Sequence, residues 1–63
     1  MNAAPTKDEG VYIECVVNGA LMKVSAIDPK TGTEASVFGP ATARTALTRT
    51  AVQKLAMVLK KQQ

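Results

Sequence analysis

The dipeptide Asn18-Gly19 constrains this chain most, because it lies between two short runs in which apolar residues alternate. Asn-Gly is the strongest short-range signal for a two-residue β-hairpin loop, since both central positions of a type I′ turn require φ > 0. The dipeptide predicts an antiparallel hairpin between strands at 11–17 and 20–27, with Asn18-Gly19 as its loop. The facing pairs predicted by this register are Tyr12 with Ser25, Ile13 with Val24, Glu14 with Lys23 and Cys15 with Met22.

Alternation along these strands separates a core face from an outer face. The predicted core face consists of Val11, Ile13, Cys15, Val17, Ala20, Met22, Val24 and Ala26. A second turn at 28–33 is rich in residues that favour turns and leads into a third strand. Pairing Ala26 with Ala35 and Val24 with Val37 keeps the core face continuous. A slip by one residue would bring Glu34 into that face.

The period of the apolar residues becomes helical after Gly39-Pro40, which we expect to end the third strand. We expect the helix over about 43–61, with Thr42 or Thr45 as its N-cap. Lys60 and Lys61 complement the negative end of the helix dipole. The stripe that should cover the sheet consists of Leu47, Ala51, Val52, Leu55, Val58 and Leu59.

These elements predict an α+β fold, a three-stranded antiparallel β-meander with one C-terminal helix packed on one face, in the order βββα. Residues 10–63 would form this single domain. Residues 1–9, which mix small and charged residues with Pro5, would form a disordered N-terminal tail.

The outer face of the predicted sheet carries more large apolar residues than a solvated surface usually does. They are Tyr12, Val16, Leu21, Ile27 and Phe38. Contiguous exposed apolar area typically marks an interaction surface, and a chain of 63 residues buries only a small core of its own. The sequence therefore predicts a homodimer, either with this face as the dimer face or with the helices exchanged between copies through the connector at 39–42. The alternative is that the five side chains pack only against one another.

The residues that could carry chemistry form no recognisable site. Cys15 is the only cysteine and the chain has no histidine, so the thiol lacks its usual base and is expected to be inert. The block Lys-Thr-Gly-Thr at 30–33 also occurs in the phosphorylation motif of ion-pumping ATPases, but here Pro29 separates it from Asp28, and turn chemistry explains it. We predict no catalytic residue, no metal ligand and no cofactor, and therefore a protein that is not an enzyme.

The C-terminal segment is purely basic, since all five acidic residues lie in the first 34 positions. The basic residues that follow are Arg44, Arg49, Lys54, Lys60 and Lys61. They could neutralise nucleic-acid phosphates, but on a helical wheel they form no single ridge and have no aromatic residue beside them for base stacking. Interaction with an unidentified protein partner is thus the favoured function, and nucleic-acid binding through this helix is the alternative.

The sequence also bears on location. Residues 1–10 have no apolar core of a secretory signal, and no stretch reaches the roughly 20 apolar residues that span a bilayer. Together with a single cysteine, these features predict a cytoplasmic protein that makes no membrane contact.

Residues 24–40 resemble a family of small uncharacterised bacterial proteins. They read Val-Ser-Ala-Ile-Asp-Pro-Lys-Thr-Gly-Thr-Glu-Ala-Ser-Val-Phe-Gly-Pro. In that family a similar hairpin with Thr-Gly-Thr-Glu precedes Gly-Pro and a C-terminal helix that ends in basic residues. The likeness covers most of 11–61 and implies the βββα order. It implies no activity and no functional residue.

Overall fold

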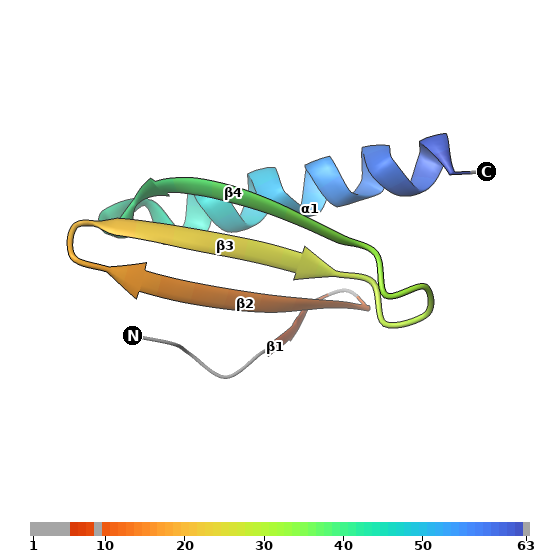
Figure 1. Cartoon of the computed structure of the whole chain (residues 1–63), viewed down its shortest axis with the longest axis horizontal. Helices are drawn as coiled ribbons and strands as arrows, with labels where there is room; N and C mark the ends of the chain where they lie inside the picture. The colour runs from red at the N-terminus through yellow and green to blue at the C-terminus, as the bar shows by residue number, and fades with distance from the viewer. Residues whose placement is uncertain (1–5, 9, 63) are drawn as a thin grey trace.

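The computed structural model describes residues 6–8 and 10–62. Its elements are the strands β1 (Thr6–Asp8), β2 (Val11–Asn18), β3 (Leu21–Ile27) and β4 (Glu34–Pro40), the 3₁₀ turn η1 (Ala41–Ala43) and the helix α1 (Arg44–Lys61). The strands form one antiparallel sheet in the order β1-β2-β3-β4, and α1 packs against β3 and β4 (Figure 1). The predicted α+β class, with a meander followed by a C-terminal helix, is confirmed.

The short strand β1 extends the sheet beyond the predicted meander. Its three residues pair with the start of β2, where Thr6 faces Ile13 and Asp8 faces Val11. The sequence analysis placed these residues in the tail, because the segment has no apolar alternation of its own. Main-chain pairing defines this strand, and such pairing leaves no pattern in the sequence. The remaining residues of the expected tail, 1–5 and 9, lie outside the described residues.

The register between β2 and β3 differs from the prediction by two residues. Asn18 pairs with Leu21, so the loop is Gly19-Ala20. Gly19 has φ 63°, which the first position of a primed two-residue turn requires, while Asn18 stays in the strand. Because the shift is even, every strand residue keeps its face; Ala20, expected on the core face, is an exposed loop residue. The observed pairs are Tyr12 with Ile27, Ile13 with Ala26, Glu14 with Ser25 and Cys15 with Val24.

The register between β3 and β4 is the predicted one, with Ala26 facing Ala35 and Val24 facing Val37. Strand β4 continues through Gly39-Pro40, which the sequence analysis expected to end it. Proline is tolerated there because β4 is an edge strand and the missing N–H leaves no ladder bond unmade.

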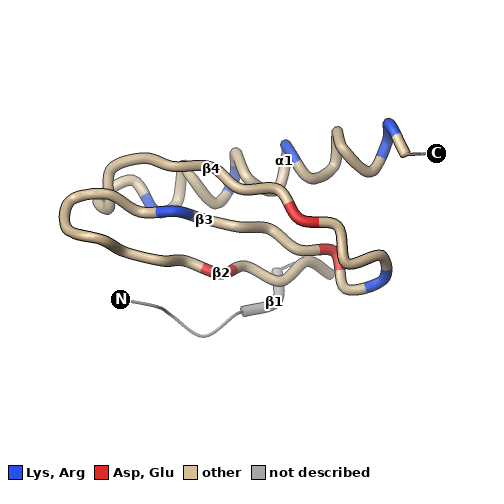
Figure 2. Tube along the Cα trace, viewed as in Figure 1, with Lys and Arg blue, Asp and Glu red and all other residues tan. Residues whose placement is uncertain are grey.

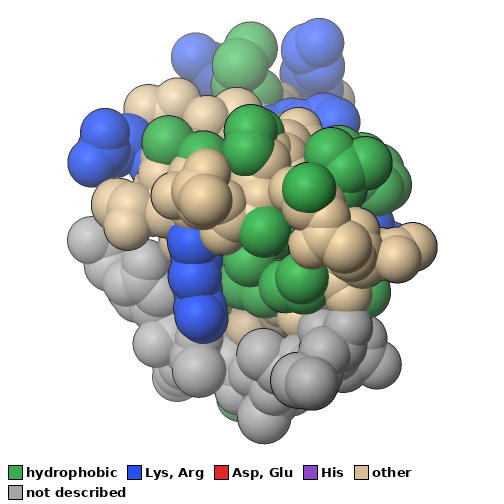
Figure 3. Space-filling view, turned by 90° about the vertical axis from the view of Figure 1, so that its left-hand side faces the viewer, with side chains coloured by type: hydrophobic (Ala, Val, Ile, Leu, Met, Phe, Trp, Pro, Cys, Tyr) green, Lys and Arg blue, Asp and Glu red, His purple; other side chains and the backbone are tan. Residues whose placement is uncertain are grey.

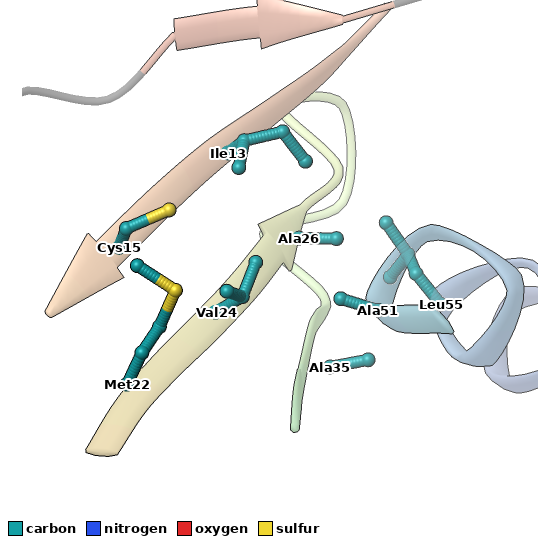
Figure 4. Close-up of a cluster of buried hydrophobic side chains, with 8 residues drawn as sticks. All are labelled: Ile13, Cys15, Met22, Val24, Ala26, Ala35, Ala51 and Leu55. Carbon is teal, nitrogen blue, oxygen red and sulfur yellow. The ribbon is translucent and has the colours of Figure 1, made fainter. Parts of the chain in front are cut away.

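The core lies between α1 and one face of the sheet (Figure 4). Its buried hydrophobic side chains are Ile13, Cys15, Met22, Val24, Ala26, Ala35, Ala51 and Leu55. All eight belong to the predicted core face, its continuation on β4 or the predicted helix stripe. Leu47, Val52 and Leu59 pack around them from α1. Among the described residues, the helix covers one side of the sheet and no element covers the other.

The helix α1 starts close to the predicted residue but has a different N-cap. The helix bounds agree with the prediction within one residue, but the N-cap is Ala43, whose side chain cannot cap, rather than Thr42 or Thr45. The cap prediction is wrong because η1 runs directly into α1 and places both threonines within turn or helix. The backbone N–H of Ala41 donates to the carbonyl of Ala20 at 2.8 Å, which holds this connector against the β2–β3 loop.

Candidate interaction surface

We call the side of the sheet opposite α1 the outer face. The strand register arranges its residues in rows that run across β2, β3 and β4. Starting from the 28–33 loop, the rows are Tyr12-Ile27-Glu34, Glu14-Ser25-Ser36, Val16-Lys23-Phe38 and Asn18-Leu21-Pro40. Each row alternates along its strands with residues of the core. The outer face therefore has two central rows that carry Glu14 and Lys23, and two end rows.

All five residues predicted for the dimer face lie on the outer face, but they form two groups. Tyr12 and Ile27 face each other in the row next to the 28–33 loop, whereas Val16, Leu21 and Phe38 occupy the two rows next to the β2–β3 loop. The row Glu14-Ser25-Ser36 separates the groups. The surface is thus apolar at both ends and polar across one central row.

The exposure of these side chains is uneven. Phe38 is 72% exposed, Leu21 60% and Tyr12 39%, while Val16 and Ile27 are half-buried. Viewed from the end that carries the β2–β3 loop, the molecule shows apolar side chains near the centre, with Lys and Arg above them and to their left (Figure 3). Large apolar side chains this exposed on neighbouring rows form a patch of the kind that marks contact with another molecule.

Pro40 extends this patch and was missed by the sequence analysis. It faces Leu21 across the strands and is exposed. Its signal is the alternation Ser36, Phe38, Pro40, which continues the outer face by one more position. An expected end of the strand at Gly39-Pro40 hides this signal, whereas β4 runs through Pro40.

The two serines of the central polar row find hydrogen-bond partners within one copy of the chain. Ser25 is only 1% exposed although it lies on the outer face, and its Oγ lies 2.8 Å from Ser36 Oγ. The Ser36 hydroxyl donates to Glu34 Oε2 at 3.3 Å. Since a hydroxyl carries one proton, Ser25 is then the donor to Ser36. The bond between the serines links β3 to β4 on the outer face, in addition to the main-chain ladder.

The five predicted nucleic-acid contacts all lie exposed on α1, whereas the described carboxylates lie on the sheet and at the 28–33 loop (Figure 2). They do not all point the same way. Lys54 Nζ donates to the main-chain carbonyl of Ser36 at 3.0 Å, so its ammonium group lies at the edge of β4. An ammonium group at an edge strand occupies a main-chain acceptor that another strand would otherwise use. No sequence pattern signals a main-chain partner of this kind.

The Lys-Thr-Gly-Thr block at 30–33 forms a closed turn, as the sequence analysis inferred. Asp28 closes it through its backbone N–H, which donates to the Thr33 carbonyl at 2.8 Å, and through its carboxylate, which accepts the Thr31 hydroxyl at 2.9 Å. The Thr33 hydroxyl also lies 3.3 Å from Gln62 Oε1, which ties the loop to the end of α1. The loop residues therefore serve the hairpin and the helix end.

Cys15 lies in the core and is 3% exposed. In the part of the chain that the structure describes, no three His, Cys, Asp or Glu side chains gather closely enough to hold a metal ion. Over the same residues, no helix combines the length and apolar character that a membrane crossing requires.

An antiparallel meander with one helix across one face, and no described element on the other face, defines a small α+β protein with a half-covered sheet. The chain belongs to the family of the domain of unknown function DUF6898, whose profile matches residues 8–62. The match spans β2 to β4 and all of α1. The inferred membership in an uncharacterised family is thereby confirmed. No curated protein and no solved structure matches the chain.

Proposed function

We propose that this protein is a non-enzymatic interaction module that acts as a homodimer, with the outer faces of two copies packed together. The observation that carries the proposal is the exposure of Phe38 and Leu21, at 72% and 60%, on the sheet face opposite the helix. Burying a large apolar side chain contributes about 1.5–3 kcal/mol. A two-fold dimer gains this contribution from both copies at once.

The make-up of the core supports the same proposal. Of the eight buried hydrophobic residues in the described part of the chain, three are alanines, and small side chains remove little apolar area from water. Small domains with a limited core commonly gain stability by associating. The partner that would use the assembled dimer, its cytoplasmic location and the bacterial origin implied by the family resemblance stay predictions.

The test compares two substitutions of the same kind on opposite sides of the molecule. Phe38→Asp places a carboxylate within the proposed contact, whereas Met57→Asp changes a residue that is 62% exposed on α1. Light scattering behind gel filtration should show the wild type and Met57→Asp as dimers and Phe38→Asp as a folded monomer. Circular dichroism checks the fold of each variant.

Helix exchange is the other route to a dimer and makes the opposite prediction. It requires η1 to extend so that α1 covers the partner's sheet, and it leaves both outer faces in water. A dimer that survives Phe38→Asp unweakened would therefore contradict packing through the outer face and favour exchange.

Nucleic-acid binding by α1 is a second candidate, favoured by the purely basic charge of this helix. Arg49 and Lys60 are exposed and eleven positions apart, which is about three turns, so they lie on the same side of α1. Titration into labelled duplex and single-stranded nucleic acid, followed by anisotropy at several salt concentrations, tests this candidate. Binding should weaken with salt and with Arg49→Glu. Absence of binding at low salt would remove this candidate.

A further inference from the structure

We infer that the proposed dimer is held in one alignment by ion pairs between Lys23 of each copy and Glu14 of the other. This inference rests on the proposed dimer and specifies how its two faces meet. Glu14 and Lys23 are both half-buried and lie in the two central rows of the outer face, on adjacent strands. They are the charged residues closest to the centre of the surface that a second copy would cover.

Two two-fold alignments place one outer face centrally on another while keeping the strands of the two copies parallel or antiparallel to each other. An axis parallel to the strands lays β3 over the partner's β3, so that Lys23 meets the partner's Lys23. The second axis is perpendicular to the strands and lies between the two central rows. It lays each central row of one copy over the other central row of its partner. Only the second alignment separates the two lysines from each other.

In the perpendicular alignment the row Glu14-Ser25-Ser36 of one copy faces the row Val16-Lys23-Phe38 of the other. Lys23 then lies over the partner's Ser25, one strand spacing of about 4.8 Å to the side of the partner's Glu14. The same rotation lays Ile27 over the partner's Leu21, so the two apolar end rows also meet.

Charge decides between the two alignments. Like charges brought together in a contact are strongly unfavourable, and a lysine drawn out of water needs a carboxylate partner. The parallel axis places Lys23 of one copy against Lys23 of the other. The perpendicular axis instead places Lys23 of each copy beside Glu14 of the other. Glu34, which also lies on this face, is in an end row, where it accepts the Ser36 hydroxyl.

Mixing two charge-reversed variants tests the pairing between copies. Glu14→Lys alone and Lys23→Glu alone each set like charges across both symmetric contacts, so we expect the dimer Kd of each to rise by about tenfold or more. In an equimolar mixture every contact joins opposite charges again, and the dimer should return to near wild-type affinity. Lys30→Glu, at an exposed position in the 28–33 loop, makes the same change in net charge as Lys23→Glu and should leave the Kd unchanged.

Cysteine cross-linking provides a second measurement that does not depend on charge. The perpendicular alignment predicts that a mixture of Ile27→Cys and Leu21→Cys forms an intermolecular disulfide, while Leu21→Cys alone does not. The parallel alignment predicts that Leu21→Cys cross-links to itself. Buried Cys15 is the native thiol and serves as the background in the unmodified chain.

The outcomes separate this inference from the proposed dimer. A wild-type chain that is monomeric would overturn both. A wild-type dimer whose two charge variants stay dimeric, or whose mixture shows no recovery, would overturn the Glu14 to Lys23 pairing and leave the dimer standing. Self-cross-linking by Leu21→Cys would overturn the perpendicular axis in the same way.

Discussion

Gly39 and Leu47 lie so close together that a β-carbon added to Gly39 would be 2.6 Å from Leu47 Cδ2. The other methyl and Cγ of Leu47 would lie within 3.3 Å of that atom. The first turns of α1 therefore rest directly on the last residues of β4. Because residues alternate between the two faces of a strand, Phe38 and Pro40, the neighbours of Gly39, lie on the opposite side.

We expect Gly39→Ala to lower the free energy of unfolding by about 1–2 kcal/mol, because Leu47 must turn out of its place in the core. Urea unfolding at a fixed protein concentration measures the change. The double variant Gly39→Ala with Leu47→Ala provides the control. The second substitution removes the clashing methyls, so the alanine at 39 should cost less in that background. Equal costs in both backgrounds would show that the contact with Leu47 is not the cause.

The loop between β2 and β3 gives a prediction that tests the observed register. Gly19 has φ 63° and its added β-carbon would meet no atom within 4 Å, so Gly19→Ala is unfavourable through its backbone alone, by about 1 kcal/mol. Asn18→Ala should have a smaller effect, because Asn18 is an exposed strand residue. Thermal unfolding of the two variants compares them. A loop made of Asn18-Gly19 would require a positive φ at both residues. If both variants lost a similar amount of stability, the result would support that loop and contradict the observed register.

This loop also shows what the sequence could and could not predict. Which residues share a face was predictable, because strands alternate with a period of two and the core residues follow it. The register was not, because a shift by two residues leaves both faces unchanged and the apolar pattern cannot distinguish the alternatives. Backbone conformation made the choice, by placing Gly19 at the first loop position.

The candidate surface was also predictable from the sequence only in part. Its five apolar residues follow from alternation alone, and Pro40 was within reach of the same argument. Their separation into two groups depends on the register. The bond from Lys54 to the Ser36 carbonyl and the pairing of β1 with β2 involve main-chain groups, which carry no sequence signal.

The hydroxyls beneath the outer face give a further prediction. Ser25→Ala removes a donor and leaves Ser36 bonded to Glu34, so it should cost about 0.5–1.5 kcal/mol. Ser36→Ala should cost more, about 1–3 kcal/mol, because it leaves the buried Ser25 hydroxyl without its acceptor. Chemical denaturation of both variants and of the double alanine variant measures these costs. A double variant that loses the full sum of both would contradict a shared hydrogen-bond chain.

The central claim is that two copies of this chain associate through the outer face of the sheet. Sedimentation equilibrium of the unmodified protein, from micromolar to near-millimolar concentration, tests it most directly. The account predicts a mass that rises with concentration and levels off at twice the 6.6 kDa of one chain. A mass that stays at 6.6 kDa over the whole range would contradict it.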